Sequence, residues 1–371
     1  MFLFQLPDDV LYLILSYLDY KSLCRLSQVC KRSHHFTVRD GVWRRIAKDF
    51  INTGMTRQGP DLYPTILLKD RVKISQNWSR GVCRKDILLK WKINLLPWIQ
   101  LDDDVLYLSQ AADIGAYHLR GAEGGRFQHN RVTVFSGHQE DVCRFTLTDT
   151  HLVSAGGDGK IIIHDRKSDY SVEYYGHNQE VNCIDCKGEL IISGSRDRTA
   201  KIWALRPNQL GKCLHTVPTY DRVWSVAISP SLWCHLVSCL GSEFRRGAGV
   251  LDIVYESPFQ LLTCGYDTFI RYWDLRVCSR KCVMEWEEPH DSALYCIKTD
   301  KNHMIASGSS YYGVVRLWDK RQTRCLQMFQ LTSSTSSPVY SLCFNATHLY
   351  AALASALYSL DFRTSGPRHR R

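Results

Sequence analysis

The stretch GHNQEVNCIDCKGELIISGSRDRTAKIW, residues 176–203, decides the fold because its landmarks recur 39 residues earlier in the chain. Its opening Gly-His pair at 176–177 repeats at 137–138, and its turn SGSRD at 193–197 repeats as SAGGD at 154–158. A fixed period of this size indicates a repeat architecture, in which each copy is one small unit that buries its apolar face against its neighbours.

The same landmarks continue on both sides of this stretch. Strand-length alternation of apolar and polar residues surrounds each copy. The position six residues beyond the turn Asp, or its equivalent in a weaker copy, is held by Tyr117, His164, Trp203, Trp273, Trp318 and Leu360. A period of about 40–45 residues with these landmarks resembles the WD repeat over roughly residues 92–363. The resemblance implies an all-β propeller built of four-stranded blades.

A set of polar side chains accompanies the copies. His177, Ser193, Asp197 and Trp203 can join into one hydrogen-bonded network, which satisfies polar groups inside a blade. The other copies carry His138, Ser154 and Asp158, then Thr263, Asp267 and Trp273, and finally Trp318. His, Ser and Asp can also form a catalytic triad, but a triad occurs once in an enzyme, whereas this set recurs. We therefore predict structural tetrads and no catalytic residue.

One interval breaks the period. Trp203 and Trp273 lie 70 residues apart, too far for one copy and short of the ~80–90 residues that two would need. Residues 223–229 and 235–240 resemble a first and a second strand, yet another first strand follows at 250–255. The sequence thus predicts about seven blades, one of them truncated. Because half a blade leaves unpaired strand edges, we interpret this as a splice form or a gene-model error.

The first fifty residues have the spacing of three short helices. Pro7 suits a first helical turn, and the apolar residues of one face follow at Val10, Leu11, Ile14, Leu15 and Leu18. Ser22 can cap a second helix and Asp40 a third. The segment has further apolar residues, including Leu13 and Tyr17, and these are more than the apolar faces of three short helices can bury. This surplus indicates either a protein interface or packing on the rest of the chain.

The order of these residues resembles the F-box, over about residues 4–48. The matching segments are Leu6-Pro7-Asp8-Asp9-Val10-Leu11, Ile14-Leu15-Ser16-Tyr17-Leu18-Asp19, Leu23-Cys24-Arg25-Leu26, Val29-Cys30-Lys31 and Val42-Trp43-Arg44. The resemblance implies docking on the Skp adaptor of a cullin–RING ubiquitin ligase, with Leu6, Pro7, Ile14 and Leu18 as contact residues. One position departs from the family: Ser33 stands where a Trp is usual, and Phe36 is a candidate substitute.

Residues 49–91 are predicted to be a connector, and residues 364–371 a basic tail. The connector contains a basic stretch at 69–92 with two tryptophans, which can indicate nucleic-acid binding. We favour linker packing, and the net charge of +10 is spread along the chain rather than gathered into runs. No nucleic-acid partner is therefore expected.

A propeller binds its partners mainly on the face of its tight turns. Trp224, Tyr295 and Tyr340 are expected near the channel mouth on that face. Tyr266, just before a turn Asp, is expected to be exposed on the same face, with Arg196, Arg198 and Arg222 close by. In related F-box propellers an Arg-rich face binds phosphorylated segments, and the forked guanidinium suits phosphate. The resemblance thus implies a protein substrate that is phosphorylated; alternatively, the aromatics only plug the channel.

The 15 cysteines are scattered, and the single C-x-x-C, Cys183 and Cys186, has no second pair to complete a zinc site. We expect no metal, no cofactor and no membrane span, and a cytoplasmic or nuclear location. The predicted architecture is an α+β multidomain chain: an F-box helical module, then an all-β WD-repeat propeller. The resemblance implies a non-enzymatic substrate receptor of an SCF-type ligase; a WD-repeat scaffold without a ligase role is the alternative.

Overall fold

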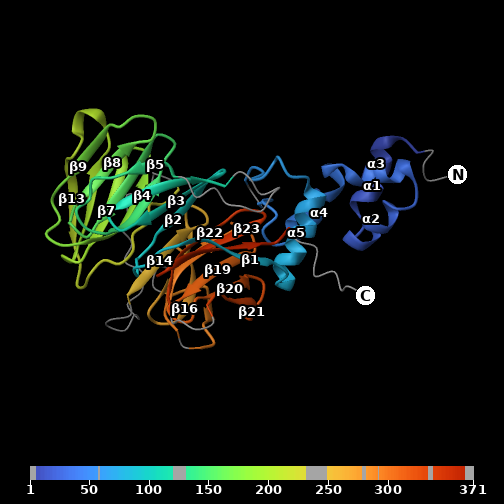
Figure 1. The fold of residues 1–371 in the computed structure, drawn as a ribbon. Helices are drawn as coiled ribbons and strands as arrows, with labels where there is room; N and C mark the ends of the chain where they lie inside the picture. The colour runs from blue at the N-terminus through green and yellow to red at the C-terminus, as the bar shows by residue number, and fades with distance from the viewer. Residues whose placement is uncertain are drawn as a thin grey trace.

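The computed structural model describes residues 6–56, 59–119, 131–230, 249–277, 281–290, 292–332 and 337–363. Four short helices form one body at the N-terminal end, and antiparallel sheets form a second, larger body (Figure 1). A fifth helix lies between the two, beside the last blade (Figure 1). The predicted basic tail, residues 364–371, lies outside the described residues.

The helical module consists of α1 (Asp8–Ser16), α2 (Tyr20–Leu26), α3 (Lys31–Val38) and α4 (Asp40–Asp49). The sequence predicted three of these and missed α3, because α3 has a single large apolar residue, Phe36, inside a polar segment. Phe36 is buried in the module core and contacts Tyr12 edge to face at 5.0 Å. It thus fills space in the core, while the Ser33 hydroxyl caps α3 by accepting a hydrogen bond from the Cys30 amide.

Two predicted helix caps are wrong. The side chain of Asp19, and not that of Ser22, caps α2: the Ser22 amide donates to the Asp19 carboxylate at 3.1 Å. Asp40 does not cap its own helix either. Its carboxylate accepts a hydrogen bond from the Leu68 amide at 2.9 Å, at the start of α5 (Leu68–Arg80). This bond joins the helical module to the segment that follows it.

Residues 49–91, which the sequence predicted to be a connector, contain α5 and β1 (Arg84–Lys90). Trp78 of α5 is fully buried and stacks on Phe362 with 3.7 Å between ring centroids. Its indole N–H donates to the Ala346 carbonyl at 3.0 Å. The strand β1 pairs antiparallel with β24 (Ala356–Asp361) and so becomes the outermost strand of the last blade.

The described part of the chain forms six four-stranded antiparallel sheets. Five are consecutive in sequence. Their strands are β2 (Ile99–Asp102), β3 (Val105–Gln110), β4 (Asp113–His118), β5 (Arg131–Phe135); β6 (Val142–Leu147), β7 (His151–Gly156), β8 (Ile161–Asp165), β9 (Ser171–Tyr174); β10 (Val181–Lys187), β11 (Leu190–Ser195), β12 (Thr199–Ala204), β13 (Cys213–Pro218); β14 (Val250–Tyr255), β15 (Gln260–Gly265), β16 (Phe269–Asp274), β17 (Met284–Glu287); and β18 (Leu294–Thr299), β19 (Met304–Ser309), β20 (Val314–Asp319), β21 (Cys325–Gln330). The sixth combines β22 (Val339–Phe344), β23 (His348–Leu353), β24 and β1.

The prediction of about seven blades is therefore wrong for the described residues: six complete blades are present. Residues 223–229 do not form a strand, although they lie where an inner strand would lie. The Val223 amide donates to the Ser195 carbonyl at 3.0 Å, and the Ile228 amide donates to the Asp185 carboxylate at 2.6 Å. The predicted second strand at 235–240 falls outside the described residues.

Residues 223–229 stay irregular because no described strand pairs with them. In the sequence, Val223 comes after blade β10–β13 in the same way that Val339 comes after blade β18–β21. The thiol of Cys183 lies 3.8 Å from the Val223 carbonyl oxygen, and that of Cys296 lies 3.3 Å from the Val339 carbonyl oxygen. Val339, however, begins a strand that pairs with β23, whereas residues 223–229 pair with no strand among the described residues. An inner segment without a ladder partner stays irregular.

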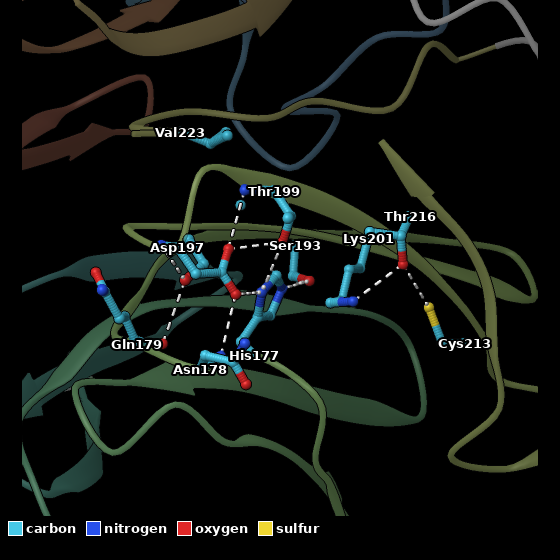
Figure 2. Close-up of polar contacts among 12 residues, drawn as sticks. His177, Asn178, Gln179, Ser193, Asp197, Thr199, Lys201, Cys213, Thr216 and Val223 are labelled. Carbon is cyan, nitrogen blue, oxygen red and sulfur yellow. Dashed lines mark hydrogen bonds and ion pairs between the residues drawn. The ribbon is translucent and has the colours of Figure 1, made fainter. Parts of the chain in front are cut away.

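The predicted tetrad is complete in blade β10–β13, and Figure 2 shows three of its members, His177, Ser193 and Asp197. Ser193 accepts the Trp203 indole N–H at 2.8 Å and contacts His177 Nε2 at 2.8 Å, while His177 Nδ1 contacts Asp197 at 2.8 Å. Burial raises the pKa of Asp197, but hydrogen bonds from Thr199 and His177 outweigh it and bring the pKa to about 2. Asp197 is thus ionised, and the neutral tautomer of His177 with its proton on Nδ1 satisfies every group.

The other copies keep parts of this network. His138 contacts Ser154 at 2.9 Å and Asp158 at 3.0 Å. In the later blades the Trp273 indole donates to Thr263 at 2.9 Å, and the Trp318 indole donates to Ser307 at 2.9 Å. Asp267, in the turn before β16, pairs instead with Arg271 of that strand. The recurrence of the same bonds in successive blades supports a structural role.

His164 gives the propeller an acid-sensitive position. It occupies the tryptophan position of blade β6–β9, is buried, and packs edge to face on Phe135 at 5.5 Å. Burial lowers its pKa from 6.5 to about 4. Between pH 6.5 and pH 4 the His164 imidazole is therefore protonated in the unfolded chain but neutral in the folded chain. The free energy of unfolding falls as the pH drops from 6.5 towards 4.

We predict that His164→Phe removes this part of the acid sensitivity. Between pH 7.5 and pH 5 the wild-type chain should lose about 2 kcal/mol more unfolding free energy than the variant. Urea denaturation followed by tryptophan fluorescence at both pH values measures the difference. Equal losses in the two proteins would contradict the buried neutral state of His164.

Candidate functional site

Helix α1 has two apolar faces. Leu11 and Leu15 point inward and are 1% and 2% exposed. A second row points outward at spacings i, i+3, i+4 and i+7, and its members are Val10 at 40%, Leu13 at 59%, Ile14 at 38% and Tyr17 at 71% exposure. We call these four residues the α1 outer row. A nine-residue helix that is apolar on its solvent side indicates a surface that another protein covers.

The structure divides the predicted adaptor contacts into two pairs. Pro7 and Ile14 are exposed, and Ile14 belongs to the α1 outer row. Leu6 and Leu18 are half-buried and pack against the core of the helical module. The sequence pattern assigned Val10 and Ile14 to the same buried face as Leu11, which is wrong. The i, i+3, i+4, i+7 spacing of the α1 outer row was the signal that could have separated the two faces.

At the other end of the molecule, the predicted aromatic residues come together. The Trp224 and Tyr266 rings lie 6.1 Å apart, Tyr266 and Tyr295 lie 6.3 Å apart, and Tyr295 and Tyr340 lie 5.8 Å apart. Successive interplanar angles are 79°, 86° and 31°. We call these four residues the aromatic arc. They come from four separate segments between residues 223 and 344, so only the closed ring of blades brings them together.

The polar atoms of the aromatic arc are not used by the fold. Neither the Trp224 indole N–H nor the hydroxyls of Tyr266, Tyr295 and Tyr340 hydrogen-bond to any described residue, and Tyr266 is 40% exposed. Burial raises the pKa values of Tyr295 and Tyr340, so both keep their protons at neutral pH. Aromatic plugs that served packing alone would be buried with their hydroxyls bonded. The arc thus presents ring surface and hydrogen-bond donors that no described residue uses.

The channel beneath the arc is closed by an ion pair. Arg144 of β6 reaches across to Asp252 of β14, with 3.0 Å between guanidinium and carboxylate. The same guanidinium donates to the Ser225 hydroxyl at 3.2 Å. Asp252 also accepts the Ile297 amide at 3.0 Å, so both charges are compensated. This cross-channel bond holds the blades of the arc against the opposite side of the ring.

The three predicted arginines differ in their surroundings. Arg196 forms an ion pair with Glu180 at 2.8 Å, so its charge is largely compensated. Arg198 and Arg222 are exposed, and their side chains make no hydrogen bond or ion pair with the described residues. Arg222 stands two residues before Trp224. The cationic character expected beside the arc therefore rests on two guanidinium groups rather than three.

The cysteine pair shows no sign of a metal site. Cys183 and Cys186 are both buried, and burial raises the pKa of each thiol to about 12. Across the described ranges, no three His, Cys, Asp or Glu side chains are placed to share a metal ion. None of the described helices is long and apolar enough to cross a bilayer.

Comparison with known proteins agrees with the fold of the helical module and with that of the propeller. The F-box-like family model matches residues 3–49, and the WD domain, G-beta repeat model matches residues 129–165, 169–204 and 280–319. Among solved structures, the WD40 repeats of RRP9 superpose with a TM-score of 0.58 at 17% identity, over 75% of this chain and 97% of that one. U3-55K superposes with a TM-score of 0.57 at 17% identity, over 75% of this chain and 98% of that one. These two likenesses concern the propeller fold.

Full-length relatives carry both modules. F-box/WD repeat-containing protein 4 is 56% identical in Homo sapiens and in Mus musculus, over 97% of this chain and 93% of each relative. The alignment runs over 384 positions, whereas 97% of 371 residues is about 360, so about two dozen positions are gaps in this chain. With an F-box-like module, WD repeats and this identity over nearly its whole length, the chain belongs to the F-box/WD repeat-containing protein family.

Proposed function

We propose that this protein is the substrate-recognition subunit of an SCF-type cullin–RING ubiquitin ligase and is not itself an enzyme. The observation that carries the proposal is the α1 outer row, four exposed apolar side chains on one face of the first F-box helix. A partner that covers this row, the Skp adaptor in our proposal, would remove them from water and so gain hydrophobic free energy.

The junction between the two bodies supports a positioning role. The Asn52 amide donates to the Asp300 carboxylate at 2.8 Å, and the Arg321 guanidinium donates to the Asp49 carbonyl at 2.8 Å. Arg71 of α5 is fully buried and bonds both Asp61 and the Thr53 carbonyl. A receptor must hold its substrate at a fixed place relative to the ligase, and a junction bonded in this way resists bending.

We predict that Leu13→Asp/Ile14→Asp abolishes adaptor binding. Two carboxylates would then be buried in an apolar interface, so affinity for the purified Skp adaptor should fall at least about thirtyfold. Co-purification and calorimetry measure the loss. Both side chains lie outside the module core, so the helical module should remain folded, as circular dichroism can show.

The control is Tyr170→Asp, which places one carboxylate at an exposed aromatic of the propeller, 64% accessible and remote from α1. It should leave adaptor affinity unchanged. If the wild-type chain does not bind the adaptor at all, the alternative of a WD-repeat scaffold without a ligase role takes the place of the proposal.

The aromatic arc is the proposed substrate surface. Tyr and Trp contribute large contact areas at low entropic cost and dominate the energetics of many interfaces. The four rings contact one another in series, half-exposed, with unused hydroxyls. In this arrangement the helical end binds the ligase core and the arc binds the protein that is to be ubiquitinated.

We predict that Tyr295→Ser/Tyr340→Ser abolishes substrate capture without weakening adaptor binding. Proteins stabilised in cells by loss of the chain should be recovered with wild type and lost with this variant in quantitative affinity proteomics. Tyr295→Phe/Tyr340→Phe keeps the rings and should retain capture. Equal recovery by wild type and the Ser variant would show that the substrate binds elsewhere.

Phosphate recognition is a separate part of the proposal and rests on Arg198 and Arg222. We predict that Arg198→Gln/Arg222→Gln removes those captured proteins whose binding is also lost after phosphatase treatment of the extract. Arg196→Gln, in which the lost charge was already paired with Glu180, is the matched control and should have a smaller effect. Capture that is insensitive to phosphatase would contradict this reading of the arginines.

A further inference from the structure

The turn between β19 and β20 carries two exposed tyrosines. Tyr311 is 55% and Tyr312 is 61% exposed, and their ring centres lie 6.2 Å apart. The corresponding turns of the three preceding blades in sequence carry Asp158, Asp197 and Asp267 instead. This blade thus departs from the tetrad pattern and presents two aromatic side chains to solvent. We call Tyr311 and Tyr312 the tyrosine turn.

The backbone of the tyrosine turn is held in an unfavourable conformation. Tyr312 has a φ of 58°, in the left-handed region that costs a bulky side chain free energy and that glycine adopts readily. The Ser309 hydroxyl donates to the Tyr311 carbonyl at 2.8 Å, and the Thr332 hydroxyl donates to the Tyr312 carbonyl at 3.0 Å. A bulky residue kept in this conformation by its surroundings indicates that the ring, and not the turn, needs a tyrosine there.

Backbone hydrogen bonds tie the tyrosine turn to two strands of the aromatic arc. The Ser310 amide donates to the Ala293 carbonyl at 2.8 Å, and the Gly313 amide donates to the Ser337 carbonyl at 2.8 Å. Ala293 comes just before β18 and Ser337 just before β22, and these strands carry two members of the arc. The turn is therefore fixed at the end of both strands at which the arc lies.

The side chains of the turn and the arc also lie close together. Burial raises the pKa of Tyr295, and the neighbouring hydroxyls of Tyr266, Tyr340 and Tyr311 raise it further. Tyr311 thus stands beside the middle of the arc. The arc and the tyrosine turn form one surface of six aromatic rings.

This surface offers ring faces and hydrogen-bond donors. The Trp224 indole N–H can only donate, and each tyrosine hydroxyl has one proton to donate. The four donors of the arc bond no described residue. A ligand that complements them brings hydrogen-bond acceptors on a firm apolar body, and because the contacts are made by side chains it needs no strand partner.

A proline-rich segment meets these requirements. Proline has no backbone N–H, and the carbonyls of a polyproline II helix make no internal hydrogen bond, so each can accept one. Aromatic-lined surfaces recognise such segments because the helix is formed before it binds. The ring centres of the arc follow one another at 5.8 to 6.3 Å, and polyproline II advances ~6 Å in two residues. A segment of this pitch can lay a residue against each successive ring.

Charge decides against a cationic segment on the same rings. Lysine and arginine side chains also bind aromatic faces. Arg222, however, stands two residues before Trp224, is exposed, and pairs with no carboxylate of the described residues. A cationic side chain at this end of the arc would meet a like charge, whereas proline carries none.

We propose that the aromatic arc and the tyrosine turn together bind a proline-rich segment of the substrate in the polyproline II conformation. The inference rests on the proposed substrate-binding function of the arc and names the class of segment that it recognises. The aromatic rings pack on the pyrrolidine rings, and the unused hydroxyls and the indole N–H donate to the carbonyls of the segment. Tyr311 and Tyr312 enlarge the contact and so contribute to specificity.

The test uses the full chain with decaproline, blocked at both ends, as the probe. Decaproline should bind saturably and shift the indole N–H resonance of Trp224, while the bonded indoles of Trp78 and Trp203 stay in place. A blocked ten-residue Gly-Ser peptide, which is flexible and rich in N–H groups, should not bind. A Trp224 resonance that does not move, or a Gly-Ser peptide that binds as tightly as decaproline, overturns the proposal.

Variants separate the use of the rings from their place in the fold. Tyr312→Gly should weaken decaproline several-fold, yet leave the melting temperature at or above that of wild type, because glycine takes a positive φ without strain. Tyr311→Ser/Tyr312→Gly should weaken decaproline at least about tenfold. Tyr170→Ser, at a tyrosine of similar exposure outside this surface, is the matched control and should stay within roughly twofold of wild type. Unchanged affinity in the double variant overturns the shared surface.

Failure of this inference can be told apart from failure of the proposed function. If Tyr295→Ser/Tyr340→Ser abolishes capture of cellular proteins but decaproline does not bind, the arc is a substrate surface for a segment of other chemistry and the inference is wrong. If decaproline binds but the chain does not bind the adaptor, the inference about the surface holds and the ligase function fails.

Discussion

The pairing of β1 with β24 is the interaction on which the rest of the structure depends. It joins residues 84–90 to residues 356–361 and so closes the ring with strands from both ends of the propeller. Trp78, stacked on Phe362, places α5 against the same closure. Because the first and last blades then lie side by side, with β2 against β22, the inner strands meet around one channel, and the aromatic arc depends on that meeting.

This closure also explains how much of the fold could be predicted. The tetrads were predictable because each is set by spacing within one blade, as with Ser193 and Trp203. The pairing of β1 was not, because its partner strand lies more than 260 residues away in the sequence. The helix α5 was missed for a related reason: its apolar residues contact two different bodies and so do not form one periodic stripe. Trp78 packs on the propeller, whereas Leu68 and Val72 pack on the helical module.

For the candidate site, sequence reasoning identified residue types but not their partners. It placed Trp224, Tyr295 and Tyr340 at one channel mouth, and the ring contacts agree with that placement. It could not see that Glu180 compensates Arg196, because the pair is decided by side-chain direction across a blade.

The irregular segment 223–229 bears on how the two ends of the molecule are joined. Residues 223–229 are held by Ser195 and Asp185 of the preceding blade and by the Arg144 contact to Ser225, without a ladder of their own. Trp224, one end of the aromatic arc, stands on this segment. Side-chain and single backbone bonds resist displacement less than a paired strand does, so this end of the arc is the weakest part of the ring. The helical module, bonded through α5 to the opposite, fully paired blade, does not share that weakness. Adaptor binding should therefore be less sensitive than substrate binding to changes in this segment.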